Sequence, residues 1–543
     1  MDDGGWRSET EERGRRLEAL VEGEWDLLIV GGGITGAALA YVATHARPAL
    51  RVALVERGDL ASGTSSRSSR LLHGGLRYLA QGRLGLVRAL LQGRKELAAL
   101  APHLARPARF LLPMTGAAWR QRAGLRLYAA MAGDLQLESL DRATALAREP
   151  LLDGSPLEGA LTYDELATHD ARLVVELAMG AVAGGAVVLP RVECEGLVRK
   201  ASHVVGARVS DRLSGAALQV RSKVVVNATG PWCDRLGVGE AGSRGHPQVR
   251  LSRGTHLVLS PTRLPLRHTV VMFSPRDGRA LFASPRDGLV LIGTTENQHD
   301  GPPETALPTA ADIDYLLEAA QVAFPGAHLG GKDVAAAFSG VRPLALAGGG
   351  GVGASARDDE GDKDPGAMDR GYLIRWDAPG LLSIRGGKLT LALTGARQVL
   401  AAVSRASCDL RLPRVVAPPF SLPPLSGEPP PGAALRGELE KVVPMVTADR
   451  LLATYGARSG ELLPLLAAPS ARWPLFPGLP HLAAEWQHAR RFEWAISFED
   501  FARRRGDLWL LHAVGALGVP SPPFDTAATR PSLHTGPFRG RAA

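Results

Sequence analysis

Three glycines and one acid near the N-terminus have the spacing of a dinucleotide-binding site. The segment GGGITG places Gly31, Gly33 and Gly36 between a short apolar run and a stretch that can form a helix. The first glycine allows a tight bend, the second lets the backbone approach a pyrophosphate, and the third packs the helix on the strand. The helix N-terminus favours the negative phosphates. A second apolar run, 51–55, ends at Glu56, which is placed to accept a hydrogen bond from a ribose hydroxyl. This pattern does not by itself distinguish NAD from FAD.

The segments that follow Glu56 resemble a known family of flavoenzymes. They are RGDLASGTSSRSSRLLHGGLRYL (57–79), APHLARPARFLLP (101–113), NATGPWCDRL (227–236), LSRGTHLVL (251–259), LIGTTE (291–296), SGVRPL (339–344) and IRGGKLT (384–390). In order and spacing they resemble the FAD-dependent glycerol-3-phosphate dehydrogenases, which are aerobic and quinone-linked. The resemblance covers most of residues 24–400 and, more loosely, 440–510. It implies an α/β fold with a Rossmann-type FAD-binding domain, an antiparallel β-sheet substrate (cap) domain and a small C-terminal helical domain.

The resemblance implies that FAD is the cofactor and that small polar residues and glycines hold it. The serines and the threonine within 64–69 can donate hydrogen bonds to the pyrophosphate and the flavin edge. The expected FAD contacts are Gly31, Gly33, Ile34, Thr35, Gly36, Glu56, Arg57, Gly63, Thr64, Ser65, Ser66, Ser68, Ser69, Leu71, His73, Gly74, Gly75, Val192, Ala228, Thr229, Gly230, Gly387, Lys388, Leu389 and Thr390. These segments contain no cysteine, so we expect non-covalent binding; a linkage through His73 is left open.

Basic residues at matching positions are expected to bind the substrate, which the resemblance gives as glycerol 3-phosphate. The planar guanidinium of arginine matches the oxygens of a phosphate monoester. The family uses the positions of Arg342 and Arg370 for this purpose, and Arg77 is expected to orient flavin or substrate. Lys388 follows a Gly-Gly pair before a helical run. We expect it to add positive charge beside the flavin and to reach the substrate.

Two histidines, His73 and His256, are candidates for the general base that accepts the hydroxyl proton. The ordinary pKa of histidine suits proton transfer near neutrality. Both match family positions. We favour His256 as the base and His73 as a residue that orients flavin or substrate.

Three positions depart from the family pattern and leave the substrate open. Glu296 stands where the family usually has Asp, Thr35 replaces the usual Asn of the glycine turn, and residues 391–398 read LALTGARQ where a tyrosine and an arginine are common. The resemblance implies oxidation of sn-glycerol 3-phosphate to dihydroxyacetone phosphate, with electrons passed to a membrane quinone. Alternatives are an oxidase that uses O2, a flavoenzyme for another small phosphorylated or acidic alcohol, and a non-catalytic flavin-binding paralogue. The short 346–367 loop favours the quinone-linked enzyme over the oxidases, whose cap insertion is longer.

Composition is that of an ordinary globular protein of two or three domains, with 45% hydrophobic and 22% charged residues. The net charge of +8 comes almost wholly from arginine, since the chain has seven lysines. Because no nucleic-acid-binding motif is present, we interpret this charge as compositional drift and expect no nucleic-acid partner. Cys194, Cys233 and Cys408 have no CxxC spacing, so we expect neither a metal site nor a disulfide framework. A polar N-terminus and reduced cysteines indicate a cytoplasmic protein; whether it forms a homodimer is left open.

Residues 117–128 (AAWRQRAGLRLY) have the composition of a helix that lies on a membrane surface. Trp119, Leu125, Leu127 and Tyr128 are interspersed with Arg120, Arg122 and Arg126. Such a helix can bind an anionic membrane surface, and a quinone acceptor would require this contact. We therefore expect peripheral association with the inner face of the cell membrane; a surface helix packed on the body of the protein is the alternative.

Periodicity and composition divide the chain into regions that must position these residues. They are a polar lead-in at 1–24, helical from Glu18; the oxidoreductase region at 25–410; a Pro-rich linker at 411–433; a C-terminal helical domain at 434–525; and a tail at 526–543. Within 25–410, the FAD-binding parts are about 25–110, 180–240 and 370–405, and the cap parts are about 111–179 and 241–369. We expect a helix over 83–100, strands at 186–189 and 219–226, and hairpins over 251–295 with an Asp-Gly turn.

Overall fold

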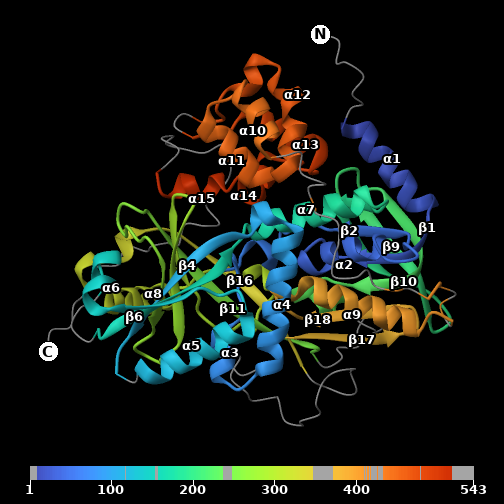
Figure 1. The fold of residues 1–543 in the computed structure, drawn as a ribbon. Coiled ribbons are helices and arrows are strands. Elements are labelled where there is room, and N and C mark those ends of the chain that lie inside the picture. Colours follow the sequence, from blue (N-terminus) through green and yellow to red (C-terminus); the bar gives the residue numbers. More distant parts are fainter. Residues whose placement is uncertain are drawn as a thin grey trace.

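Two β-sheets, the helices packed on them and a group of C-terminal helices make up the protein in this computed structural model (Figure 1). The structure describes residues 9–116, 118–152, 157–236, 247–346, 371–408, 410, 412–414, 416, 425, 432–476 and 479–515. The expected 346–367 loop and most of the expected linker lie outside these residues.

The first sheet, here called the parallel sheet, contains the strand before the glycine turn. Its strands in spatial order are β17 (Tyr372–Ala378), β18 (Leu381–Gly386), β10 (Ala217–Asn227), β1 (Glu24–Val30), β2 (Val52–Glu56) and β7 (Val187–Pro190), with β9 (His203–Asp211) and β8 (Val192–Lys200) joined through β10. From β18 to β7 the neighbours are parallel, and β17 is an antiparallel edge strand. This is the expected Rossmann-type arrangement, with the glycine turn at the carboxyl end of β1.

Both faces of the parallel sheet are covered, which explains why β1 is a continuous apolar run. On one face, Leu27 and Ile29 pack with helices α2 (Ile34–Thr44), α7 (Asp170–Ala183) and α9 (Ala392–Arg405). On the other face, Leu28 packs with β8, β9 and helix α1 (Glu9–Glu22). The prediction that the N-terminal helix starts at Glu18 was wrong. The helix starts at Glu9 because it is anchored at both ends: Arg13 pairs with Asp211, and Leu20 is fully buried.

The second sheet, here called the cap sheet, is mostly antiparallel. In spatial order its strands are β15 (Asn297–Gln298), β11 (Val249–Leu259), β14 (Leu289–Gly293), β13 (Ala280–Arg286), β12 (Thr269–Phe273), β4 (Arg106–Met114), β6 (Gly159–Ala167) and β3 (Leu71–Leu72), while β16 (Val334–Ala345) pairs with β11 and β5 (Leu137–Asp141) with β6. The β4–β12 pair is parallel. The expected Asp287-Gly288 turn joins β13 to β14, and both residues have positive φ, as a two-residue hairpin turn requires.

Helices flank the cap sheet and connect it to the parallel sheet. They are α3 (Leu76–Ala80), α4 (Leu84–Leu100), α5 (Ala118–Ala132), α6 (Arg142–Arg148) and α8 (Ala310–Ala323). Helix α8 shares an apolar core with β11 to β14. Helices α3, α4 and α5 contact one another and share a core with β4 and β6. In the described residues, no helix has the length and apolar character needed to span a bilayer.

The C-terminal helices form a separate group at one end of the molecule (Figure 1). They are α10 (Gly432–Glu440), α11 (Met445–Tyr455), α12 (Leu463–Leu466), α13 (Ala483–Phe492), α14 (Phe498–Arg504) and α15 (Leu508–Ala513). Phe501 and Trp509 pack against cap-sheet residues such as Phe338. Buried ion pairs join the group to the body, because Arg505 binds Asp59 at 2.7 Å and Asp507 binds Arg70.

Candidate active site

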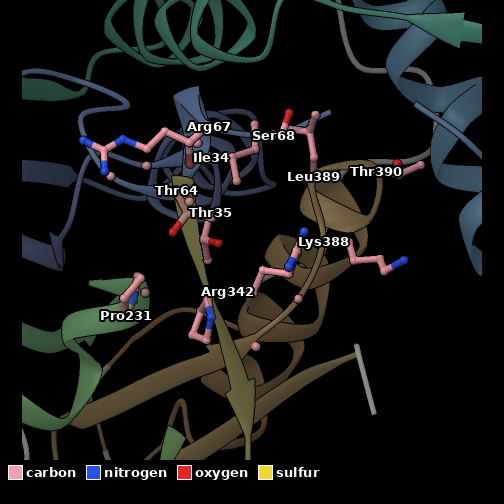
Figure 2. Close-up of a pocket in the computed structure, with 18 of the residues that line it drawn as sticks. Ile34, Thr35, Thr64, Arg67, Ser68, Pro231, Arg342, Lys388, Leu389 and Thr390 are labelled. Atoms are coloured by element: carbon pink, nitrogen blue, oxygen red, sulfur yellow. The ribbon is translucent and has the colours of Figure 1, made fainter. Parts of the chain in front are cut away.

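A cavity of about 1340 Å³ lies between the parallel sheet and the cap sheet. It is lined by the glycine turn, the 62–69 loop, β8, the start of β13, part of β16 and the segment 386–390. Figure 2 shows side chains from several of these segments, including Ile34, Thr64, Arg342 and Lys388, around the cavity. Pockets for drug-sized ligands occupy roughly 300–1,000 Å³. This cavity is therefore large enough for a dinucleotide together with a small substrate.

The glycine turn can only be built without side chains. Gly31 has φ +115°, and a Cβ there would lie 2.6 Å from the carbonyl oxygen of Ala228. A Cβ on Gly36 would lie 2.0 Å from the Gly31 carbonyl oxygen, so this residue allows α2 to pack close to the turn. At the start of α2, the Ile34 amide donates to Ser65 Oγ at 2.9 Å. Amide groups at the N-terminus of a helix can bind the oxygens of a phosphate.

Glu56 ends β2 beside the glycine turn. Its carboxylate accepts hydrogen bonds from the amides of Gly32 and Gly58, both at 2.7 Å. Burial raises the pKa of Glu56, although the two amides oppose the shift. The side chain is thus fixed at the cavity wall at the end of the second strand, where a ribose hydroxyl would be recognised.

The 62–69 loop is held by residues from both halves of the molecule. Thr64 donates to the Val341 carbonyl on β16, and Ser68 donates to Asp170 on α7 at 2.7 Å. Ser69 Oγ lies 2.8 Å from Nε2 of His256 on β11. These contacts orient the loop before any ligand binds, which reduces the entropy lost on binding.

Most of the expected site residues line the cavity. They are Gly31, Gly33, Ile34, Thr35, Glu56, Arg57, Gly63, Thr64, Ser65, Ser68, Ser69, Leu71, His73, Gly75, Arg77, Val192, Ala228, Thr229, Gly230, Arg342, Gly387, Lys388, Leu389 and Thr390. Four expected residues, Gly36, Ser66, Gly74 and His256, are not among the lining residues. Arg370 lies outside the described residues.

Positive charge is concentrated at one end of the cavity. Arg342 on β16 donates to Thr294 Oγ1 at 3.0 Å and to the Thr295 carbonyl at 3.3 Å. Burial, together with the charges of Arg279 and Arg77, lowers the pKa of Arg342 to about 10. Lys388 precedes α9; its ammonium donates to the Tyr78 hydroxyl and lies 4.0 Å from the centre of the Tyr78 ring. Such a cluster favours an anionic ligand, in particular one with several oxygens.

The two candidate histidines differ in position. His73 lines the cavity, near Phe282. His256 is 2% exposed and its ring stacks on Phe338 behind Ser69. Burial, reinforced by Arg342 and Arg70, lowers the pKa of His256 to about 3, so it stays neutral near pH 7. His256 does not line the cavity, its Nε2 faces Ser69 Oγ, and its lowered pKa makes it a weak base. The geometry thus favours His73 over His256 as the base, and the choice between them stays a prediction.

Tyr78 and Glu165 are among the cavity residues that the sequence analysis missed. Tyr78 lies within the LRYL segment, but nothing in that segment indicated a contact with Lys388. Glu165 lies on β6, where its carboxylate accepts from Tyr128, from Arg94 at 3.2 Å and from the Gly74 amide at 3.4 Å. Burial raises the pKa of Glu165 to about 7. An acidic residue inside an otherwise buried strand was the one available sign of this site.

The cavity has an apolar part next to α3 and α5. Leu76, Leu79, Leu125, Leu127, Phe273 and Phe282 line it. The prediction that the apolar residues of α5 face a membrane was partly wrong. Leu125 and Tyr128 are instead buried in the core shared with α4 and β4. Trp119 and Leu127 are exposed, at 68% and 50%, and the side chains of Arg122 and Arg126 are exposed beside them.

Comparison with known proteins identifies relatives that match about two thirds of the chain. The FAD dependent oxidoreductase family matches residues 26–390. The chain is 37% identical over 379 residues to the aerobic glycerol-3-phosphate dehydrogenase of Staphylococcus epidermidis, covering 68% of this chain and 65% of that protein. The corresponding protein of Staphylococcus aureus strain USA300 is 36% identical over 390 residues, covering 70% and 67%. The chain thus matches slightly less than two thirds of the length of the Staphylococcus epidermidis protein.

Solved structures extend the similarity to the C-terminal helices. The glycerol-3-phosphate dehydrogenase of Bacillus halodurans, solved as a complex with FAD, is 29% identical, with a TM-score of 0.70 over 93% of this chain and 94% of that chain. The L-α-glycerophosphate oxidase of Mycoplasma pneumoniae, also with FAD bound, is 20% identical with a TM-score of 0.52 over 73% of this chain. The second similarity is one of fold alone.

Proposed function

The chain belongs to the FAD-dependent oxidoreductases, in the family of the glycerol-3-phosphate dehydrogenases, and from this we propose that it oxidises sn-glycerol 3-phosphate to dihydroxyacetone phosphate. The observation that supports this substrate best is the group of basic side chains, Arg342, Lys388 and Arg77, at the cavity that also contains the glycine turn. A phosphate monoester requires such a group.

The cofactor is FAD, and the cavity residues fit it. The fit is tested by the glycine turn itself. A Cβ at Gly31 or Gly36 would collide with the backbone, and the Ile34 amide at the N-terminus of α2 donates to Ser65 Oγ at the cavity wall. We propose that Gly31 to Gly36, Glu56 and the 63–69 loop hold the dinucleotide, and that 387–390 approaches its redox-active end. When bound, FAD supplies the hydride acceptor.

The chain's own residues then have to bind the phosphate, orient the alcohol and accept a proton. Arg342 binds the phosphate through its planar guanidinium, while Lys388, positioned by Tyr78, reaches the same end of the cavity. His73 accepts the proton of the secondary hydroxyl at an unprotonated ring nitrogen. His256 acts one step away, since its Nε2 orients the Ser69 hydroxyl. Arg370 is retained as a second phosphate ligand on the basis of the resemblance.

A membrane quinone is the electron acceptor that we propose. What supports it is the apolar part of the cavity, which Leu125 and Leu127 of α5 line. The same helix exposes Trp119 and the basic Arg122 and Arg126. A helix with exposed aromatic and basic residues can lie at an anionic membrane surface, and a quinone would enter the cavity from there. An oxidase that reduces O2 is the competing proposal.

Steady-state product analysis tests the activity. FAD-loaded protein, sn-glycerol 3-phosphate and a soluble electron-accepting dye are incubated without oxygen. We expect one dihydroxyacetone phosphate for each two-electron reduction of the dye. Turnover with glycerol as fast as with glycerol 3-phosphate would contradict the substrate assignment, and absence of turnover with any phosphorylated alcohol would favour the non-catalytic paralogue.

A further inference from the structure

An arginine and a glutamate in the cap sheet contribute to the basic end of the cavity, and the proposed function assigns them no role. Arg279 lies in the turn between β12 and β13 and lines the cavity. Its guanidinium donates to the carboxylate of Glu296, whose side chain is fully buried. The same carboxylate oxygen lies 3.8 Å from Arg77 on α3. Glu296 thus lies between two arginines that come from different elements.

Arg279 and Arg77 also lie close to Arg342. All three arginines line the same cavity. The charges of Arg279 and Arg77 contribute to the lowered pKa of Arg342, as expected for cations that lie near one another. The backbone accommodates this arrangement at Gly254 on β11, where a Cβ would lie 2.2 Å from Arg342 Nη2. Gly254 therefore lets the Arg342 guanidinium lie flat across β11 and extend toward Thr294 and Thr295.

Three arginines that repel one another are destabilising unless an anion joins them. Glu296 supplies one negative charge, which orients Arg279 and draws Arg77 toward it. A buried carboxylate that is itself hydrogen-bonded fixes its partner in one direction, as supporting residues do around binding sites. The remaining positive charge at this end of the cavity matches a doubly charged phosphate monoester.

We propose that Arg279 is a binding residue for the phosphate of the substrate and that Glu296 is the positioning residue that holds Arg279 and Arg77 toward it. The inference rests on the proposed function for the identity of the phosphorylated alcohol. Arg279 contacts the phosphate directly, whereas Glu296 acts through the two arginines.

Arg279 is tested with inorganic phosphate as the probe. FAD-loaded Arg279→Gln protein is titrated with phosphate by calorimetry at constant ionic strength, because salt screens such contacts. Loss of one charge-assisted contact should raise the dissociation constant about ten- to a hundredfold. The matched control is Arg276→Gln in the same turn, which removes an equal charge from a half-exposed residue that pairs with Glu318 and does not line the cavity. A change of less than fivefold, or an equal change in the control, would overturn the role of Arg279.

A second variant guards against misfolding. Arg279→Lys keeps the charge but loses the planar fork, so we expect phosphate affinity between those of Arg279→Gln and the parent. The FAD content of each variant, measured by absorbance, reports whether the cavity is intact. Full affinity in Arg279→Lys and Arg279→Gln alike would reject the proposal.

Substitution of Glu296 distinguishes a positioning role from a purely electrostatic one, because the two roles change the phosphate affinity in opposite directions. Removing a negative charge beside an anion site should tighten phosphate binding if Glu296 acts by charge alone. If it positions the arginines, Glu296→Gln should weaken phosphate binding at least fivefold, and Glu296→Asp should restore most of the affinity. Tighter binding in Glu296→Gln would disprove the positioning role.

The phosphate titration also separates this inference from the proposed function. If the parent protein binds phosphate through Arg279 but does not oxidise glycerol 3-phosphate, the proposed anion site is supported and the proposed substrate is wrong. If the parent oxidises glycerol 3-phosphate and the Arg279→Gln variant binds phosphate as tightly as the parent, the proposed function is supported and the role of Arg279 is wrong.

Discussion

We propose that substrate recognition depends at the residue scale on Arg342, a half-buried side chain near the cationic groups of Arg279 and Arg77. Its own hydrogen bonds go to a hydroxyl and a carbonyl of the segment after β14. These acceptors fix the direction of the guanidinium without neutralising it. A half-buried cation that is oriented in this way at the cavity wall can bind an anionic ligand.

Arg342→Ala should therefore weaken substrate capture without releasing FAD. Loss of a charge-assisted hydrogen bond destabilises the complex by roughly 1.5–3 kcal/mol, so kcat/KM for glycerol 3-phosphate should fall about ten- to a hundredfold. Activity with glycerol, which has no phosphate, should change little. Steady-state kinetics with both alcohols measure the discrimination; a variant that discriminates as well as the parent would exclude the phosphate contact.

A second experiment distinguishes the roles of His73 and His256 by the effect of each substitution on kcat. Because His73 lines the cavity and His256 does not, His73→Asn should lower kcat by about 10²- to 10⁴-fold, the range for loss of a general base. The kcat of His73→Asn should also depend less on pH than that of the parent. His256→Asn should affect kcat less, since it acts through Ser69. The assignment is refuted if His73→Asn stays within fivefold of the parent while His256→Asn is inactive.

At the element scale, the strands and helices of the parallel sheet were predictable because their apolar patterns are local. The runs before Gly31 and up to Glu56 became β1 and β2, and the helix expected over 83–100 is α4. The Asp287-Gly288 turn was predictable because both positions need positive φ. The pairing of β4 with β12 was not, since it joins segments far apart in the chain.

The candidate site could be predicted only where it follows short motifs. The glycine turn, the serine-rich loop and Lys388 come from such motifs and do line the cavity. Arg279 and Glu165 lie at unremarkable positions on strands or turns, and tertiary packing alone brings them to the wall. His256 occupies a matching strand, yet its side chain lies behind Ser69, which no local pattern could reveal. The assigned roles and the domain boundaries remain predictions.

Helix α5 is the element on which the membrane proposal depends. Reversing Arg122 and Arg126 to Glu should weaken binding to anionic vesicles at least about tenfold, because each arginine near such lipids contributes on the order of 1 kcal/mol. Reduction of a soluble dye should stay intact while quinone reduction falls. Co-sedimentation with vesicles at low salt measures the binding.

The control for α5 is Arg405→Glu with Arg414→Glu, two exposed residues outside this helix that give the same change in net charge. Equal loss of vesicle binding in both double variants would show that total charge, not α5, determines the binding. No loss in either would favour the oxidase.

At the scale of the whole molecule, the C-terminal helices and the helices that border the apolar part of the cavity lie at opposite ends (Figure 1). The buried Asp507–Arg70 and Arg505–Asp59 ion pairs join the C-terminal helices to residues on either side of the 62–69 loop. Helices α3 and α5, which border the apolar part of the cavity, lie on the opposite side (Figure 1). The proposed membrane contact would therefore lie on the α3–α5 side, away from the C-terminal helices, whose ion pairs hold Asp59 and Arg70 on either side of the 62–69 loop.

The whole protein should be sensitive to acid because of buried neutral histidines. Burial lowers the pKa of His103 and of His481 to about 4, and the charge of Arg172 adds to the effect at His103. The folded values lie below the ordinary value of about 6.5. The unfolded chain therefore binds more protons between these values, and stability is lost as the pH falls below about 6.5.

His103→Gln isolates this effect, since His103 packs on Gly456 away from the cavity. Each such histidine removes up to roughly 1.4 kcal/mol per pH unit across the window. The thermal midpoint of the FAD-loaded variant should therefore decline less than that of the parent between pH 6.5 and 4.5. Parallel declines would show that His103 is not responsible.

Reduction of the bound flavin by sn-glycerol 3-phosphate tests the central claim most directly. FAD-loaded protein is mixed with the substrate in a stopped-flow instrument without oxygen or added acceptor, and the visible flavin absorption is followed. The account predicts that the band bleaches at a rate that saturates with substrate, that one dihydroxyacetone phosphate forms per flavin, and that Arg342→Ala requires about ten- to a hundredfold more substrate for the same rate. A band that persists at high substrate concentration, in protein whose flavin is still bleached by dithionite, would contradict it.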